Sequence, residues 1–202
     1  MIQLPENLPA ELAPLAWLLG VWEGTGVLNY PVGDEVRNYE FGQRMSFSHD
    51  GLPHLNYNSY TWLLDSGDDP LPTPLATESG YWRLSRTATD ADPGPGLLAG
   101  VGEAAFATAE AVETLRNANG AFDIEVSILH PGGVSELYLG EAASARIDLA
   151  TDVVMRSSTA KEHTASTRMY GLVDGHLLWA WDLAALGRPL TSHASARLAR
   201  VD

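Results

Sequence analysis

Short stretches in which apolar and polar residues alternate recur along most of the chain. A first stretch, VWEGTGVLNY, spans 21–30, and others follow at 39–49, 54–64, 79–86, 121–129, 134–142, 144–155, 164–173, 176–186 and 192–201. The separators HDGLP, DSGDDPLPTP, HPGG and VDG are rich in turn-forming residues. Alternation with a period of two is typical of half-buried strands. The sequence therefore predicts an all-β fold, an antiparallel meander barrel of about ten strands with room for one small ligand.

Two segments lack this alternation of apolar and polar residues. LPAELAPLAWLLG at 8–20 predicts a short helix that ends at Gly20, which would serve as a left-handed cap. The segment 87–120 opens with the turn-rich TATDADPGPG and continues with EAAFATAEAVETLRNANG, an alanine-rich sequence compatible with a helix. Its apolar content is too low for a core of its own. We therefore expect one domain over 1–202, with 87–120 inserted between two strands.

Composition narrows the classes of partner. The chain has 202 residues, 45% of them apolar, and a net charge of −14, so neither nucleic acid nor an anionic membrane is an expected partner. It has no cysteine, which excludes disulfides, thiolate metal sites and haem attached through Cys-x-x-Cys-His. No basic segment precedes the first apolar residues, and no run reaches the roughly 18 apolar residues of a spanning helix. These features predict a cytoplasmic protein.

One glycine-rich pattern stands at the start of the first predicted strand. Gly20, Trp22, Gly24 and Gly26 form Gly-x-Trp-x-Gly-x-Gly, with the last two glycines on one face of the strand. Alternate glycines mark a strand that another backbone, a ligand or a large side chain approaches closely. The simpler interpretation is that the tryptophan plugs the closed end of the barrel while the glycines permit tight packing.

The histidines are the other candidates for chemistry: His49, His54, His130, His163, His176 and His193. Their spacing matches no zinc motif, and the chain contains neither a Gly-x-Ser-x-Gly nucleophile motif nor a P-loop. Three of them, at 49, 54 and 176, adjoin turn signals and are expected to be exposed, and His130, before PGG, is expected to be a turn residue. His193 differs because small residues surround it in TSHASA, so a planar ligand could approach its ring. One imidazole suffices for the iron of non-covalent haem, whereas zinc needs three or four ligands.

Five blocks together resemble the nitrobindins, small haem-binding β-barrels related in architecture to fatty-acid-binding proteins. The blocks are LLGVWEGTG at 18–26 with YP at 30–31, PLATESGYWR at 74–83, ILHPGGVSELYLG at 128–140, TAKEHT at 159–164 and LGRPLTSHASARLARV at 186–201. They occur in the order of the family and leave out the 87–120 insertion. Their combination is far more specific than any single block.

The resemblance implies a function and two haem contacts. His193 falls on the position of the proximal iron ligand, and Lys161, the only lysine, falls on the lysine near the haem propionates. It implies one non-covalent haem b per chain, reversible binding of nitric oxide, and isomerisation of peroxynitrite to nitrate at the open iron position. A homodimer is also compatible with it. The Gly-x-Trp-x-Gly-x-Gly motif would support the pocket.

Two departures from the family pattern keep an alternative open. Ala76 stands where relatives carry a histidine, and Val32 stands where a threonine often follows Tyr-Pro, so two polar groups near the pocket are missing. The alternative is a carrier of a fatty acid or other apolar ligand, in which Arg168 or Arg197 would anchor a carboxylate. A scaffold role for the inserted segment is a further alternative.

Overall fold

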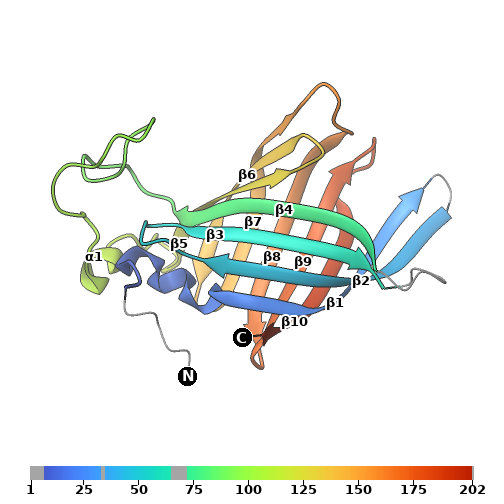
Figure 1. Cartoon of the computed structure of the whole chain (residues 1–202), viewed down its shortest axis with the longest axis horizontal. Helices are drawn as coiled ribbons and strands as arrows, with labels where there is room; N and C mark the ends of the chain where they lie inside the picture. The colour runs from blue at the N-terminus through green and yellow to red at the C-terminus, as the bar shows by residue number, and fades with distance from the viewer. Residues whose placement is uncertain (1–6, 33–34, 65–71, 202) are drawn as a thin grey trace.

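Ten antiparallel strands close into a barrel, as the alternating stretches predicted (Figure 1). The computed structural model describes residues 7–32, 35–64 and 72–201, except for the side chains of Tyr30 and Val32. Each strand pairs with the next along the chain, and β10 pairs with β1 to complete the circle. The strands are β1 Gly20–Val32, β2 Glu35–Ser48, β3 Leu55–Leu63, β4 Thr73–Leu84, β5 Phe122–His130, β6 Val134–Ala143, β7 Arg146–Arg156, β8 His163–Val173, β9 His176–Ala185 and β10 Thr191–Val201.

Two strands begin earlier than the sequence predicted. β2 starts at Glu35 rather than at 39, and β4 starts at Thr73 rather than at 79. The first six residues of β2 and the first five of β4 are all exposed, so neither face carries an apolar row. Alternation therefore gave no signal there, because it reports burial of one face rather than strand geometry.

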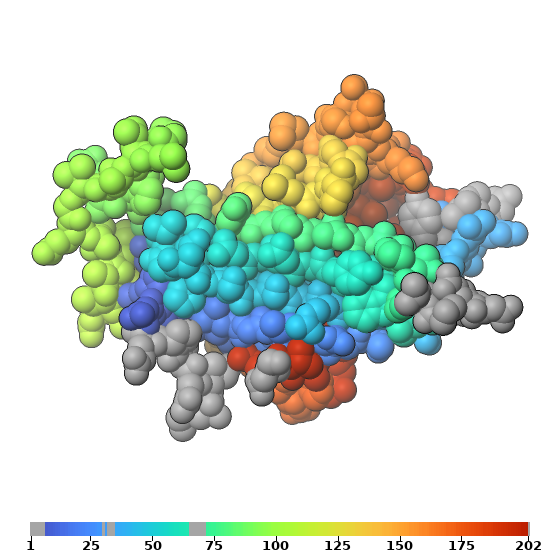
Figure 2. Space-filling model, viewed as in Figure 1, coloured from blue at the N-terminus to red at the C-terminus, as the bar shows by residue number. Residues whose placement is uncertain are grey.

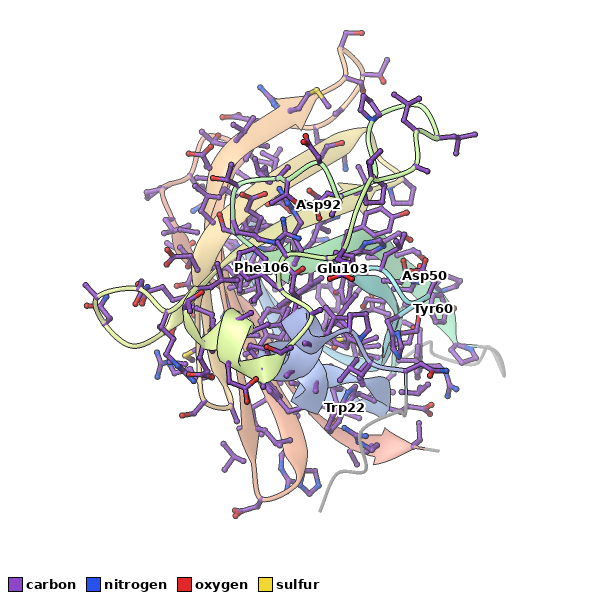
Figure 3. The ribbon with its side chains drawn as sticks, turned by 90° about the vertical axis from the view of Figure 1, so that its left-hand side faces the viewer. Trp22, Asp50, Tyr60, Asp92, Glu103 and Phe106 are labelled. Carbon is purple, nitrogen blue, oxygen red and sulfur yellow. The ribbon has the colours of Figure 1, made fainter. Side chains whose placement is uncertain are left out.

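One end of the barrel is closed by the N-terminal helix. η1 Ala10–Leu18 is a 3₁₀-helix whose leucines, Leu12, Leu15 and Leu18, are fully buried. Gly20 follows with a φ of +116°, a conformation that favours glycine, and begins β1. The indole Nε1 of Trp22 donates to the carbonyl of Leu18 at 2.7 Å, and Figure 3 shows this side chain beside the helix. Trp22 thus closes the barrel, which is the simpler of the two interpretations of its motif.

The segment between β4 and β5 lies over the same closed end and projects from it (Figures 1 and 2). The predicted helix is shorter than expected, because only α1 Ala109–Glu113 is helical and Val112 is its one buried residue. Arg86 ties the segment to η1. Its guanidinium pairs with Glu11 at 2.6 Å and with Asp92 at 2.7 Å, all three side chains being largely buried. Figure 3 shows Asp92 and Phe106 on the segment at this end, and Arg86 also lies 5.0 Å from the ring centre of Phe106.

The other end of the barrel, here called the far end, carries the connections that follow the odd-numbered strands. The pairing of β7 with β8 runs only from Arg146 and Gly171 to Ala150 and Thr167, so the two strands part toward the far end. The last residue of β5 and the first residues of β8 and β10 lie there. Among the described residues, no helix is long and apolar enough to cross a bilayer.

Candidate functional site

His193 lies in a β-bulge at the far end. In the pairing of β10 with β9, Ser192 opposes Asp182 and Ala194 opposes Trp181, which leaves His193 as the extra residue. Toward the closed end, Ala194, Ala196 and Leu198 alternate along the inner, more buried face of β10. A bulge re-aims a side chain locally. It allows the half-buried imidazole of His193 to join that inner face beside Ala194.

Asn29 and Trp181 both contact the imidazole of His193. The pairing of β1 with β10 ends at Leu28 and Ala194, and the next residue of β1, Asn29, accepts a hydrogen bond from the His193 ring through its backbone carbonyl. The indole of Trp181 meets the imidazole edge to face, with ring centroids 5.1 Å apart and planes at 84°. Burial lowers the pKa of His193 from its ordinary value, in spite of the hydrogen bond to Asn29, which acts to raise it. The neutral form of the ring is therefore favoured.

Trp181 lies at the centre of the site. The guanidinium carbon of Arg168 lies 4.3 Å from the indole centre, and the ring of His130 stacks nearly parallel to the indole, at 12° and 6.4 Å. The ring of His163 lies 6.4 Å away at a tilt of 38°. The indole Nε1 is buried and has no hydrogen-bond partner among the described residues.

Behind Trp181 four side chains form a closed cycle of acids and bases, here called the charge ring: Glu78, Arg168, Glu136 and His130. Arg168 makes a bidentate pair with Glu78 at 2.7 and 2.9 Å, and its Nη2 lies 3.8 Å from Oε2 of Glu136. Nε2 of His130 lies 2.7 Å from the same Glu136 oxygen, and Nδ1 of His130 lies 3.7 Å from Oε1 of Glu78. Four strands, β4, β5, β6 and β8, contribute one member each.

Neutral and basic side chains saturate the two carboxylates. Glu136 accepts hydrogen bonds from the hydroxyls of Tyr138 and Ser166 at 2.7 and 2.6 Å. Nε2 of His163 lies 2.9 Å from Glu136 Oε1, as an ion-pair contact rather than an aligned hydrogen bond. Glu78 accepts from the hydroxyl of Tyr57 at 2.8 Å. Buried carboxylates of this kind stay charged only when such partners replace water.

The surroundings of both carboxylates favour their ionised form. Burial acts to raise the pKa of Glu136, but the contacts with His130 and His163 and the charge of Arg168 hold it far below its usual value. Burial likewise acts to raise the pKa of Glu78, and the charge and hydrogen bonds of Arg168 lower it. Arg168 itself, although buried, has a pKa raised well above its usual value by the charge of Glu78.

The structure corrects the expectation for His130. It is the last residue of β5 rather than a turn residue, and its imidazole reaches inward between two carboxylates. The sequence could not show this, because Glu78 and Glu136 lie on other strands. His49, His54 and His176 do adjoin turns, but each is half-buried rather than fully exposed.

Glu78 and Glu136 are two of the residues that the sequence analysis missed, and Trp181 is a third. Both lie on the buried face of their strands, Glu78 with Gly80 and Trp82, and Glu136 with Val134 and Tyr138. A carboxylate on the core-facing side of an alternating stretch is the signal that could have found them.

The remaining predicted residues fall at both ends of the barrel. Lys161 is exposed in the connection from β7 to β8, at the far end and two residues before His163. Gly24 and Gly26 approach the backbone of β10, where an added Cβ would lie 2.3 Å from the carbonyl oxygen of Arg197 and 2.5 Å from that of Ser195. Ala76 lies two residues before Glu78 on β4 and therefore on the same face of the strand, but it is exposed whereas Glu78 is buried. The side chain of Val32 lies outside the described residues.

Comparison with known proteins identifies the family. Residues 11–200 match the family described as "THAP4-like, heme-binding beta-barrel domain". The chain belongs to this family. The match confirms the haem-binding barrel family that the five sequence blocks indicated.

Full-length relatives of this haem-binding barrel carry one name. The chain is 65% identical over 202 residues to a protein of Clavibacter michiganensis subsp. michiganensis named peroxynitrite isomerase, with complete coverage of both chains. A peroxynitrite isomerase of Leifsonia xyli subsp. xyli is 62% identical over 202 residues, again with complete coverage of both. Among solved structures, Rv2717c from M. tuberculosis superposes with a TM-score of 0.66 at 26% identity, covering 99% of this chain and all of the other.

The residues at the far end fit a haem. Among the described residues, no three His, Cys, Asp or Glu side chains are grouped to hold a bare metal ion. Haem needs less from the protein, because the porphyrin supplies four of the iron ligands and one neutral imidazole supplies a fifth. His193 offers that imidazole, held at its other nitrogen by a backbone carbonyl, an arrangement typical of metal-binding histidines. Beside it lies the buried indole Nε1 of Trp181, which has no hydrogen-bond partner among the described residues.

Proposed function

We propose that this barrel is a haem-dependent peroxynitrite isomerase in which His193 binds the iron. The observation that carries the proposal is the half-buried, bulged imidazole at the far end, whose lowered pKa keeps it neutral. The name of the full-length relatives supports the reaction. When bound, haem supplies an iron with one open position at which peroxynitrite can rearrange to nitrate.

The side chains around His193 have distinct tasks. The carbonyl of Asn29 fixes which ring nitrogen carries the proton, so that the other presents its lone pair to iron. The indole of Trp181 covers one side of the imidazole and keeps water from it. Lys161, exposed at the same end, supplies a positive charge for a haem propionate on an otherwise acidic protein.

We further propose one non-covalent haem b per chain and binding of nitric oxide at the same iron position. The chain has no cysteine for covalent attachment, and its sequence contains one imidazole in the TSHASA setting. Nitric oxide and peroxynitrite are both small, and a single protein ligand leaves one iron position for either of them.

The geometry disfavours a carrier that anchors a fatty acid through Arg168 or Arg197. Arg168 is already neutralised by a bidentate pair with Glu78, and its side chain is only 2% exposed. Arg197 alternates with buried Ala196 and Leu198, which places it on the outer face of β10. Neither guanidinium is available to a carboxylate inside the barrel.

The deciding experiment is a titration of the purified full-length apoprotein with ferric haem. The wild-type protein should develop a ligated Soret band with one haem per chain, and His193→Ala should leave the spectrum of free haem. The loaded wild type should then convert peroxynitrite to nitrate in excess of the apoprotein. Identical Soret bands for wild type and His193→Ala would show that His193 is not the iron ligand. A nitrate yield from the loaded protein equal to that from the apoprotein would show that the protein is not a peroxynitrite isomerase.

A further inference from the structure

We propose that Trp181, clamped by the charge ring, is a positioning residue that fixes the orientation of the His193 imidazole. This inference rests on the proposed role of His193 as the iron ligand. It assigns a task to the buried Glu78, Arg168, Glu136 and His130, which the proposed reaction does not otherwise use.

The orientation of the His193 ring depends on contacts beyond the pairing of its own strand. The residue lies in the bulge, outside the pairing of β10 with β9. The hydrogen bond to the Asn29 carbonyl fixes the direction of one ring nitrogen. The edge-to-face contact with Trp181, with ring centroids 5.1 Å apart, fixes the plane of the ring about that direction.

Trp181 is in turn held by two members of the charge ring. Arg168 lies over the indole at 4.3 Å, a cation–π distance, and His130 stacks nearly parallel to it. Arg168 cannot swing away, because both of its terminal nitrogens are bound to Glu78. His130 is held by Glu136 at 2.7 Å. The indole is therefore flanked by two side chains that carboxylates hold in place.

The charge ring is itself rigid. Glu136 is fully buried, and the hydroxyls of Tyr138 and Ser166 donate to it, so its carboxylate has no freedom to rotate. Tyr138 also accepts from Nε of Arg168 at 3.0 Å, which links the two sides of the ring. Apolar side chains of similar volume would fill the same space at lower cost, because buried ions lose their hydration. Compared with apolar side chains, the charge ring makes directional contacts, which fix the angle of a neighbouring side chain as well as its position.

A neighbouring tryptophan supplies a matched control. Trp179 precedes Trp181 by two residues on the same face of β9; it is buried, whereas Trp181 is half-buried. It packs against Phe41 and Tyr170, and its Nε1 donates to Gln43 at 2.7 Å. Trp179 thus shares residue type, strand and face with Trp181, but among the described residues it contacts Gln43 and these aromatic rings rather than His193.

The test uses the full chain loaded with haem and reduced to the ferrous state. Resonance Raman spectroscopy reports the iron–histidine stretching band, which responds to the orientation of the imidazole, and transfer of haem to apomyoglobin reports the rate of haem loss. Trp181→Phe and His130→Gln should shift or broaden the band and speed haem loss about tenfold, the usual effect of removing support from a metal ligand. Trp179→Phe should leave both unchanged.

The outcomes separate this inference from the proposed function. If Trp181→Phe matches the wild type, or if Trp179→Phe produces the same shift, Trp181 does not position His193. If Trp181→Phe fails to fold, His130→Gln provides the test, because glutamine keeps a hydrogen-bond donor to Glu136 and removes only the ring that stacks on Trp181. An iron–histidine band that is unshifted in His130→Gln would then overturn the proposal. A His193→Ala protein that retains the wild-type band would instead overturn the role of His193.

Discussion

The imidazole of His193 and the indole of Trp181 meet edge to face at 5.1 Å, although their strands pair one residue out of register at this point. The bulge that causes the shift also brings His193 to the inner face of the barrel. Without it, strict alternation would place 192 and 194 on one face and turn 193 outward. A single extra residue in β10 therefore creates the site.

The first prediction concerns the pH dependence of folding in the apoprotein. Burial lowers the pKa of His193 from its ordinary value of 6.5, so the unfolded chain takes up a proton at higher pH than the folded chain does. The contribution of this residue to the free energy of unfolding is therefore greatest above pH 6.5 and declines as pH falls below it. Urea denaturation at a series of pH values should show the wild type losing more stability on acidification than His193→Gln. Parallel curves would contradict the prediction.

A second prediction concerns Lys161. Because the side chain is exposed, its attraction for a propionate is screened by water and salt. Lys161→Ala should weaken haem binding by about 1 kcal/mol or less, and the difference should fade at high salt. Lys161→Arg, measured by the same haem titration, should retain the wild-type affinity. A loss that is independent of salt would mean that the lysine acts through packing.

The sequence allowed the barrel to be predicted because most strands bury one face, so that apolar and polar residues alternate along them. It gave no sign of the bulge at His193, which depends on hydrogen-bond pairing with β9 rather than on residue type. His130 was wrongly predicted as a turn residue for a similar reason. Its partners, Glu78 and Glu136, come from the two neighbouring strands, and only the closed barrel brings Arg168 to them.

A third prediction follows from the burial of the Arg168–Glu78 pair. Arg168→Met leaves two buried carboxylates without their cation and should lower the free energy of unfolding by about 3–5 kcal/mol. Adding Glu78→Leu to that variant should cost less than the sum of the two single substitutions, because the pair is then removed as a unit. Arg146→Met is the control, since Arg146 pairs with Asp148 on the exposed surface and its loss should leave the free energy of unfolding nearly unchanged. Additive losses in urea denaturation would contradict the coupling.

A fourth prediction tests the close approach of β1 and β10. A Cβ at Gly24 would lie 2.3 Å from the carbonyl oxygen of Arg197 and 2.9 Å from Cα of Leu198, so backbone must move to admit it. Gly24→Ala should lower the free energy of unfolding by about 1–3 kcal/mol. Gly132→Ala is the matched control, because no atom lies within 4 Å of the added Cβ there. Equal denaturation midpoints for the two variants would show that the strands are not closely packed at Gly24.

The last prediction concerns Arg86, which joins the segment 87–120 to η1 through Glu11 and Asp92. Arg86→Met leaves two largely buried carboxylates unpaired, so the segment should detach from the closed end of the barrel. Hydrogen exchange should then rise across 87–120, while the affinity for haem at the opposite end stays at the wild-type value. Arg83→Met is the control, because Arg83 pairs with Glu125 where its side chain is 47% exposed and should alter neither measurement. Unchanged exchange in Arg86→Met would show that other contacts hold the segment, whereas a loss of haem affinity would couple the inserted segment to the site at His193.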